Sequence, residues 1–542
     1  MIPAPEPSVA RYPAHFGGGG RAEHRRSRAS RRGSARERAE GRDRASRATR
    51  SDRDRARDGL QSRLNASEVR FSTAADLGAA LRKRRLSAVE LARCALELLE
   101  TLAPRYNALA ALMPERALDE AKRADAALHR KEAKPLTGIP YGAKDLLAAR
   151  GAPTTWGAPP YRDQIIGEDA TVVARLRRAG AVLSAKLAMV ELAGGGGYRY
   201  PSASLQGPGR NPWDRERWSG GSSSGSGSAV GAGIVPFAIG SETSGSIGTP
   251  SAYCGVTGLR PTYGLVSRKG AMALSWTLDK LGPMARTADD CALVLEAIAG
   301  PDAADPTTGG KRFKPLTARS ASAAVRNARI AFADEDIADH ASGEARHALE
   351  KGVAEFRKIA PRFTRATLPL MPFGPMVQSV YGAEGGEIFA ELIEGPRFEE
   401  LVDARQKAGL RASLDIKARD YLHALRLRTR LQDALAGIFD DVDVILSFGR
   451  AITATPISKP LDSPPTAGGA LPQPTKRPGN TGLIPAGNLA GVPAIFFPCG
   501  LGTDGMPVGL QLVGPPHSEP LLLALVAAYQ REYRHHLTRP KD

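Results

Sequence analysis

Cysteine is scarce in this chain of 542 residues: there are four cysteines, far apart, with no Cys-x-x-Cys pair. This spacing argues against a disulfide scaffold and against a structural zinc site. Long apolar runs are also missing. No stretch approaches the roughly 18 consecutive apolar residues of a transmembrane helix, so we expect no membrane span. The 42% hydrophobic and 24% charged residues are typical of globular proteins and exclude a wholly disordered chain.

The net charge of +18 is unevenly placed along the chain. The first 60 residues hold 16 Arg and no Lys against 8 Asp and Glu, a net charge of +8, which leaves +10 for the other 482 residues. The segment has few aliphatic residues other than Ala and cannot bury enough apolar surface to offset the entropy of ordering. We therefore predict that residues 1–65 form a disordered, Arg-rich extension.

Three interpretations of this extension compete. It could bind nucleic acid or a membrane surface, it could be a targeting segment, or it could be non-functional, for example through a start codon placed too far upstream. It lacks the continuous apolar region of a signal peptide. The acids between the arginines and the scarcity of aromatic residues favour the non-functional extension.

Alternating helix and strand patterns fill the rest of the chain. Ser87 followed by Glu90 is a capping box at the start of an amphipathic helix. The patterns also predict helices at 343–359 and 420–439. They predict strands at 181–186, 328–334, 441–447, 492–498 and 508–514. The alternation predicts an α/β fold, and residues 66–542 contain no clear linker or repeat, so we predict one large domain there.

A Gly/Ser-rich run, residues 219–233, precedes an apolar stretch at 234–240 and a second small-residue turn at 241–251. A flexible linker would not lead directly into an apolar stretch. A phosphate-binding loop would end in Gly-Lys-Ser/Thr, and a dinucleotide fingerprint would show Gly-x-Gly-x-x-Gly between a strand and a helix. The run fits better as a catalytic loop, in which small residues let backbone N–H groups approach a substrate oxygen.

Serine is the candidate nucleophile in these two segments, at positions 222, 223, 224, 226, 244 and 246. A serine needs a base to react at neutral pH. None of the nine histidines lies between His129 and His340, so a histidine would have to come from elsewhere in the fold. Lys144 is an equally good candidate for the base. It lies in the strand-like segment 138–148, where apolar surroundings would lower its pKa and leave it neutral. Taken alone, it would more often be a surface or ion-paired lysine.

Several segments together carry a family resemblance: GIPYGAKD (138–145), NPWD (211–214), GGSSSGSG (220–227), SETSGSIGTPSAYCGVTGLRPTYG (241–264), LDKLGPMARTADD (278–290) and NLAGVPA (488–494). In this order they resemble the amidase signature family over roughly residues 68–540. The resemblance implies a single large α/β domain, with a mixed, twisted β-sheet covered by helices on both faces. It also implies an amidase, a hydrolase of non-peptide carbon–nitrogen bonds in linear amides.

The resemblance assigns a catalytic triad residue by residue. Ser246 matches the nucleophile that forms the acyl-enzyme, Ser222 the bridging serine, and Lys144 the base, with a cis peptide bond before Ser222. Gly221 and Ser223 match residues that support the loop. The matching oxyanion hole consists of backbone N–H groups, those of Thr243, Ser244, Gly245 and Ser246.

Some positions depart from the pattern that many family members have. Ser224 and Ser244 stand in place of glycine, and Glu242 in place of aspartate. Gly248 follows Ser246-Ile247 where many members have arginine. The missing arginine weakens the match to the glutamine-hydrolysing component of the tRNA-dependent amidotransferases, which we keep as the alternative function.

The substrate pocket is less defined by sequence. Tyr198, Tyr200 and Trp276 lie near the motifs and could bind substrate or simply pack in the core. A Met/aromatic cluster at 371–382 could likewise be core or an apolar pocket wall, and a wall would favour apolar acyl or aryl amides over glutamine.

The sequence thus predicts a cytoplasmic amidase acting on small molecules, with amides, aryl amides and carbamates as candidate substrates. We expect no metal, no organic cofactor and no nucleic acid as a partner, and a homodimer is left open. A third hypothesis, nucleic-acid binding through the Arg-rich extension, predicts a change in behaviour when residues 1–60 are deleted.

Overall fold

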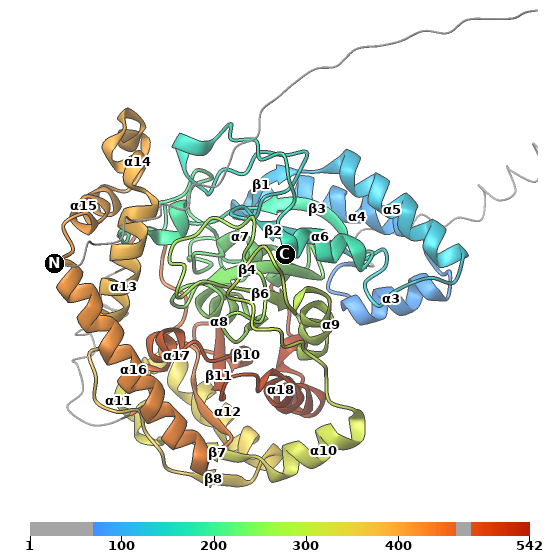
Figure 1. Ribbon diagram of the computed structural model, residues 1–542. Helices are drawn as coiled ribbons and strands as arrows, with labels where there is room; N and C mark the ends of the chain where they lie inside the picture. Colours follow the sequence, from blue (N-terminus) through green and yellow to red (C-terminus); the bar gives the residue numbers. More distant parts are fainter. Residues whose placement is uncertain (1–68, 462–478, 542) are drawn as a thin grey trace, which may run out of the picture. The chain divides into compact units, whose positions relative to one another are not determined.

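An 11-stranded sheet organises the chain in the computed structural model, which describes residues 69–461 and 479–541 (Figure 1). The predictions for residues 1–65 lie outside the described residues. In spatial order the strands are β1 (Leu109–Leu112), β3 (Val182–Leu187), β2 (Pro140–Lys144), β4 (Phe237–Glu242), β6 (Lys280–Ala285), β5 (Thr257–Arg260), β10 (Ala494–Leu501), β11 (Pro507–Val513), β9 (Val444–Phe448), β7 (Arg329–Ala331) and β8 (Arg362–Thr364).

The sheet is mixed, as predicted. Strand β2 runs parallel to both β3 and β4, and β7 runs parallel to β8 and β9. The pairs β1–β3, β4–β6, β5–β6, β5–β10, β10–β11 and β9–β11 are antiparallel. Strands β2, β3, β4 and β9 are buried along their whole length, and their sequences are mainly apolar or small residues with a few buried polar ones.

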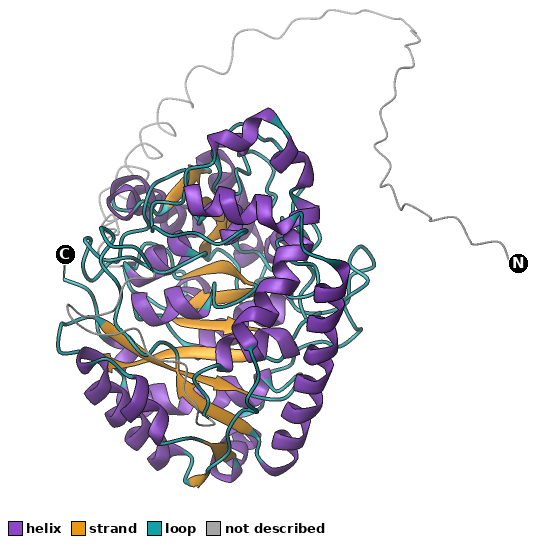
Figure 2. Cartoon of the chain, turned by 90° about the vertical axis from the view of Figure 1, so that its left-hand side faces the viewer, coloured by secondary structure: helices purple, strands orange, loops and turns teal. Residues whose placement is uncertain are grey.

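Helices lie on both sides of the strands in Figure 2, so the predicted α/β class and layering are confirmed. The α-helices are α3 (Ala74–Arg82), α4 (Ala88–Thr101), α5 (Pro114–His129), α6 (Thr171–Arg178), α7 (Ser224–Gly231), α8 (Gly248–Cys254), α9 (Ala288–Ile298), α10 (Ala318–Asn327), α11 (Glu335–His340), α12 (Gly343–Ile359), α13 (Phe373–Ile388), α14 (Ala390–Glu394), α15 (Ala404–Ser413), α16 (Ala418–Asp441), α17 (Leu483–Ala490) and α18 (Glu519–Tyr533). Short 3₁₀ turns are η1 (Ala103–Tyr106), η2 (Pro159–Tyr161), η3 (Glu191–Gly194), η4 (Pro396–Glu400) and η5 (His535–Leu537).

Local sequence signals account for several helix ends. The predicted capping box opens α4: the Ser87 side chain accepts from the Glu90 N–H, and the Glu90 carboxylate accepts from the Ser87 N–H at 2.7 Å. Helix α12 begins after Ser342, whose side chain accepts from the Ala345 N–H, and its bounds coincide with the predicted segment 343–359. Capping residues outside the apolar stripe therefore set where these helices begin.

The Gly/Ser run differs from the loop that its composition suggested, because residues 224–231 form the buried helix α7. Its small side chains allow close packing. A Cβ added to Gly225 would lie 2.5 Å from the carbonyl oxygen of Ala108, and one added to Gly227 would lie 2.8 Å from Cβ of Pro250. Only the segment before the helix, including Ser222 and Ser223, remains as a loop.

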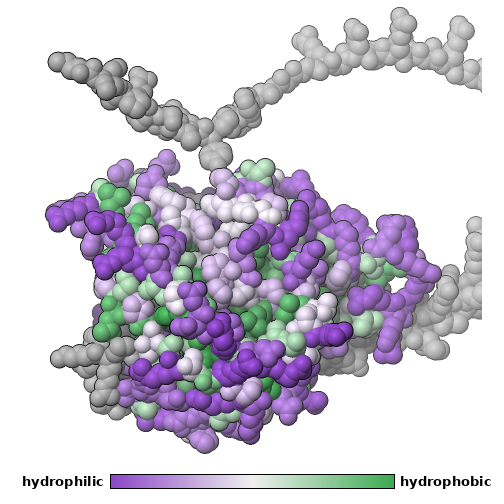
Figure 3. All heavy atoms as spheres, turned by 60° about the horizontal axis from the view of Figure 1, so that its bottom comes forward, coloured by the Kyte–Doolittle hydropathy of each residue, from purple (hydrophilic) through white to green (hydrophobic). Residues whose placement is uncertain are grey.

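The surface in Figure 3 is mixed: hydrophilic side chains cover much of that face, with smaller hydrophobic areas between them. The four cysteines are buried thiols. Within the described ranges, 69–461 and 479–541, no helix has both the length and the apolar character needed to cross a membrane.

Candidate active site

Two parallel strands place the predicted base beside the two predicted serine segments. Residues 141–143 of β2 pair with residues 237–239 of β4, so the carboxyl ends of both strands lie at the same edge of the sheet. Lys144 is the last residue of β2, and β4 continues through Ser241 and Glu242 into the loop that holds Ser246.

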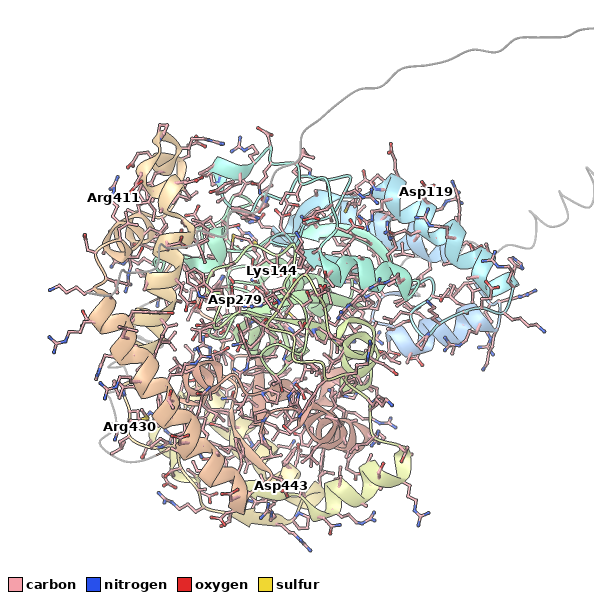
Figure 4. All side chains as sticks on the ribbon, in the orientation of Figure 1. Asp119, Lys144, Asp279, Arg411, Arg430 and Asp443 are labelled. Carbon is pink, nitrogen blue, oxygen red and sulfur yellow. The ribbon has the colours of Figure 1, made fainter. Side chains whose placement is uncertain are left out.

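Lys144 is fully buried and donates two hydrogen bonds. Its Nζ lies 2.8 Å from Ser222 Oγ and 2.8 Å from Ser241 Oγ. Burial lowers the pKa of Lys144 from 10.5 to about 7, although the negative charges of Asp279 and Glu242 act in the opposite direction. Figure 4 shows this interior position: Lys144 and Asp279 lie near the middle of the view, whereas Arg411 and Arg430 lie on helices at its periphery. A substantial fraction of Lys144 is therefore uncharged at neutral pH and able to accept a proton.

The loop before α7 carries Ser222 into contact with this lysine. The peptide bond between Gly221 and Ser222 is cis. Ser223 ties the loop to its neighbours: its Oγ donates to the Ser241 carbonyl at 3.2 Å, and its N–H donates to the Ser246 carbonyl at 3.3 Å. A Cβ added to Gly221 would lie 2.8 Å from the Val190 side chain. Any larger residue would therefore collide with Val190 at this position.

The loop from Thr243 to Ser246 presents backbone N–H groups beside a cavity. Within the described part of the chain, none of the four N–H groups of residues 243–246 donates to a protein acceptor. Gly245 has φ +89°, a conformation that side chains disfavour. Thr243, Ser244 and Ser246 line the cavity. These donors can stabilise negative charge that develops on a substrate oxygen.

Glu242 holds the end of the 243–246 loop through hydrogen bonds and an ion pair. Its Oε2 accepts from the N–H groups of Ile247 and Gly248, each at 2.9 Å. Its Oε1 accepts from Arg260 Nη1 at 2.9 Å and from Asn488 Nδ2 at 2.8 Å. Burial acts to raise the pKa of Glu242, but Arg260 and the hydrogen-bond donors outweigh it and lower the pKa to about 2. Glu242 thus stays ionised and fixes the start of α8.

Asp279 supports the loop from the other side. Its Oδ1 accepts from Thr243 Oγ1 at 2.5 Å, and its Oδ2 accepts from the N–H groups of Leu274 and Ser275 at 2.8 and 2.9 Å. Burial raises the pKa of Asp279 despite these donors. Through these bonds Asp279 positions Thr243, the first of the predicted oxyanion donors.

Asp145 follows Lys144 in the same motif and helps to hold the end of β2 in position. Its Oδ1 lies 2.7 Å from Lys186 Nζ in an ion pair whose two side chains are fully buried. Its Oδ2 accepts from the Thr155 N–H at 3.0 Å. Removing one partner of such a pair would leave an uncompensated buried charge, so the pair holds the end of β2 in place.

A cavity of about 740 Å³ opens beside Ser246. Tyr198 lines it, but the structure does not bring Tyr200 and Trp276 to it: their side chains are 39% and 41% exposed, and neither belongs to the lining. The Tyr200 N–H is held by Asp403 at 3.1 Å, and the Trp276 carbonyl accepts from the Tyr263 hydroxyl at 2.6 Å. Proximity to the motifs in sequence was therefore a poor guide for these two residues.

Helix α13 forms one wall of the cavity, through Gly374, Val377, Gln378 and Tyr381. The predicted Met/aromatic cluster divides accordingly. Tyr381 faces the cavity, whereas Met376 packs in a buried cluster with α16 and α17, and Met371 and Phe373 pack against that cluster. Among the residues described, no group of three His, Cys, Asp or Glu side chains is arranged to hold a metal ion.

Three further polar residues at the site were not among the sequence predictions. Ser241 is the second partner of Lys144, and Arg450 and Gln511 line the cavity. Ser241 opens one of the family-like motifs, so the motif itself was a signal. Arg450 follows β9 and Gln511 lies within β11; these two strands pair, and both residues line the cavity only through this tertiary arrangement.

Comparison with known proteins agrees with this geometry. A family model described as Amidase matches residues 90–523. The chain belongs to the amidase signature family.

Relatives of this family member include a component of the glutamyl-tRNA(Gln) amidotransferase of Coxiella burnetii (strain RSA 493 / Nine Mile phase I). It is 34% identical over 495 residues, covering 86% of this chain and 99% of the relative. The native peptide amidase from Stenotrophomonas maltophilia superimposes with a TM-score of 0.74 at 29% identity, covering 87% of this chain and 98% of that one. A solved structure of a vestigial protein complex, reported to reveal the evolutionary origins of an s-triazine catabolic enzyme, matches with a TM-score of 0.76. The two chains are 29% identical, and the match covers 87% of this chain and 100% of that one. Members of this family are hydrolases of carbon–nitrogen bonds.

Proposed function

We propose that this protein is an amidase that hydrolyses the amide bonds of small molecules through an acyl-enzyme on Ser246. The observation that carries the proposal is the buried contact between Lys144 Nζ and Ser222 Oγ, 2.8 Å apart. The Ser223 N–H, next along the chain, bonds the Ser246 carbonyl, so the bridging serine lies beside the nucleophile's own backbone.

In the proposed reaction, neutral Lys144 accepts the Ser222 proton while Ser222 accepts the Ser246 proton. The freed Ser246 oxygen attacks the amide carbon, and the N–H groups of residues 243–246 stabilise the oxyanion. The proton returns through Ser222 to the leaving nitrogen, and the C–N bond breaks. Water, deprotonated by the same relay, then attacks the acyl-enzyme and releases the acid and Ser246.

The cavity supports a small-molecule substrate. Its volume of about 740 Å³ falls within the usual range for small-molecule sites. Leu274, Val377, Phe448 and Ile484 give it apolar surface, and the free N–H groups mark where the reacting carbonyl would lie. Aryl amides and carbamates are therefore candidates beside aliphatic amides. A homodimer and a cytoplasmic location remain predictions.

The second candidate is glutamine hydrolysis within a tRNA-dependent amidotransferase. The relatives of that name, about one-third identical over nearly their whole length, favour it. Glutamine, however, carries an ammonium group, and no Asp or Glu occurs among the described residues that line the cavity. The geometry therefore fits an independent amidase better.

The test is activity on a panel of amides, anilides, esters, carbamates and glutamine, with ammonia or amine release as the readout. Ser246→Ala should abolish both turnover and serine-directed labelling, and Ser244→Ala, which keeps the backbone N–H, serves as the matched control. Labelling that persists in Ser246→Ala would refute the nucleophile assignment. Turnover of glutamine alone, and only after a partner protein is added, would favour the second candidate.

A further inference from the structure

Arg450 lies beside the nucleophile but has no place in the proton relay. It follows β9 by two residues, and its Nε donates to Thr249 Oγ1 at 3.0 Å. Thr249 belongs to the first turn of α8, three residues after Ser246. A Cβ added to Gly245 would lie 3.7 Å from Arg450 Nη2. The guanidinium is thus held against the same loop that carries the candidate oxyanion donors.

The positive charge of Arg450 is not matched by a carboxylate in the part of the chain that the structure describes. Of the carboxylates in residues 69–461 and 479–541, none forms an ion pair with it. Its hydrogen bonds within those ranges go to Thr249 Oγ1 alone, through Nε and Nη2. An arginine presents five N–H donors in a planar fork that matches a carboxylate, so most of its capacity faces the cavity unused.

The other groups of the cavity define the charge that would complement this arginine. Apart from Arg450, His340 and tyrosines are the titratable side chains among the described lining residues. Gln511 is 2% exposed: its Nε2 donates to the Phe448 carbonyl at 3.0 Å, and its buried Oε1 has no partner among the described residues. The described lining therefore offers an anion site at Arg450 and no carboxylate that would bind a cation.

We propose that Arg450 binds a carboxylate of the substrate, so that the enzyme prefers amides carrying a carboxylate and no ammonium group. This inference rests on the proposed function and narrows its substrate class to compounds such as the monoamides of dicarboxylic acids. Pairing with Arg450 holds one end of the molecule while the N–H groups of residues 243–246 hold the reacting carbonyl.

Three amides of equal chain length test this preference. Glutaramate carries a carboxylate only, glutamine adds an ammonium group, and valeramide carries neither charge. We expect glutaramate to be hydrolysed with a kcat/KM about tenfold to a hundredfold above both others, the range of a charge-assisted hydrogen-bonded pair. Arg450→Gln should remove the preference for glutaramate over valeramide, mainly through KM. Arg430→Gln, on the exposed face of α16, should keep it.

A binding measurement separates this inference from the proposed function. Ser246→Ala should still bind glutaramate, measured by calorimetry, at least about tenfold more tightly than valeramide. Equal binding of the two, or equal turnover by an active wild-type enzyme, would overturn the role of Arg450 and leave the amidase proposal standing. Tighter binding of glutamine than of glutaramate would also overturn it. Hydrolysis that is unaffected by Ser246→Ala would instead refute the proposed function.

Discussion

Lys144 should give the enzyme a pH profile governed by a buried lysine. Its pKa of about 7 makes about three-quarters of the lysine neutral at pH 7.5. With the ordinary value of 10.5, about 0.1% would be neutral, so burial increases the available base by nearly a thousandfold, on the order of the whole contribution of a general base. Activity should therefore fall about tenfold per pH unit below pH 6 and level off above pH 8.

The assay is the second-order rate of labelling by a serine-directed fluorophosphonate, which needs no knowledge of the substrate. The rate should rise with an apparent pKa near 7, and Lys144→Ala should lose it. Asp279→Asn removes a negative charge that raises the pKa of Lys144, so its profile should shift to lower pH. A wild-type rate that keeps rising to pH 10, or a profile that Asp279→Asn shifts upward, would refute this reasoning.

Two further predictions concern stability and the N-terminal extension. Glu242→Gln should lower the free energy of unfolding by about 3–5 kcal/mol at pH 7, because it leaves the buried charge of Arg260 without its carboxylate partner. Chemical denaturation should show a far smaller loss for Glu399→Gln, which breaks an exposed ion pair. Since the pKa of Glu242 is lowered from 4.5 to about 2, its contribution is present above pH 4.5 and lost as the pH falls through 2, and an equal loss in both variants would contradict this account. Deletion of residues 1–63 should leave amide hydrolysis intact, as measured on the same panel, and nucleic-acid binding lost on deletion would instead support the third hypothesis.

Sequence patterns predicted much of the fold because buried parallel strands and capped helices leave strong local signals. Strands β3, β9, β10 and β11 begin and end within three residues of their predicted bounds, and α12 matches its prediction. Strands β5 and β6 were missed because β5 has only four residues and β6 contains glycine and proline, which disfavour strands. Helix α7 was missed because Gly and Ser disfavour isolated helices, and tertiary packing overrides that preference here.

The site shows the same division. The motifs predicted Lys144, Ser222 and Ser246 as the triad; in the structure Lys144 contacts Ser222 and Ser246 lines the cavity, and their catalytic roles stay a prediction. The cavity's specificity residues could not be read in this way, since Arg450 and Gln511 acquire their position only through strand pairing across the sheet. A lone arginine after a predicted strand gives no functional signal until the fold shows that it contacts Thr249, three residues after Ser246.

Helix α13 makes one wall of the cavity while packing against α15, α16 and α17, away from the strands that hold the relay. The opposite wall consists of the loops around Ser222 and Ser246, where an added methyl group would collide with neighbouring atoms. New substrate preferences are therefore most accessible through Gln378 and Tyr381, which line the cavity and take no part in the proposed proton path. The loops around Ser222 and Ser246 are too tightly packed to accept larger side chains, whereas the wall formed by α13 can be changed. Directed evolution for other amides should therefore begin on α13.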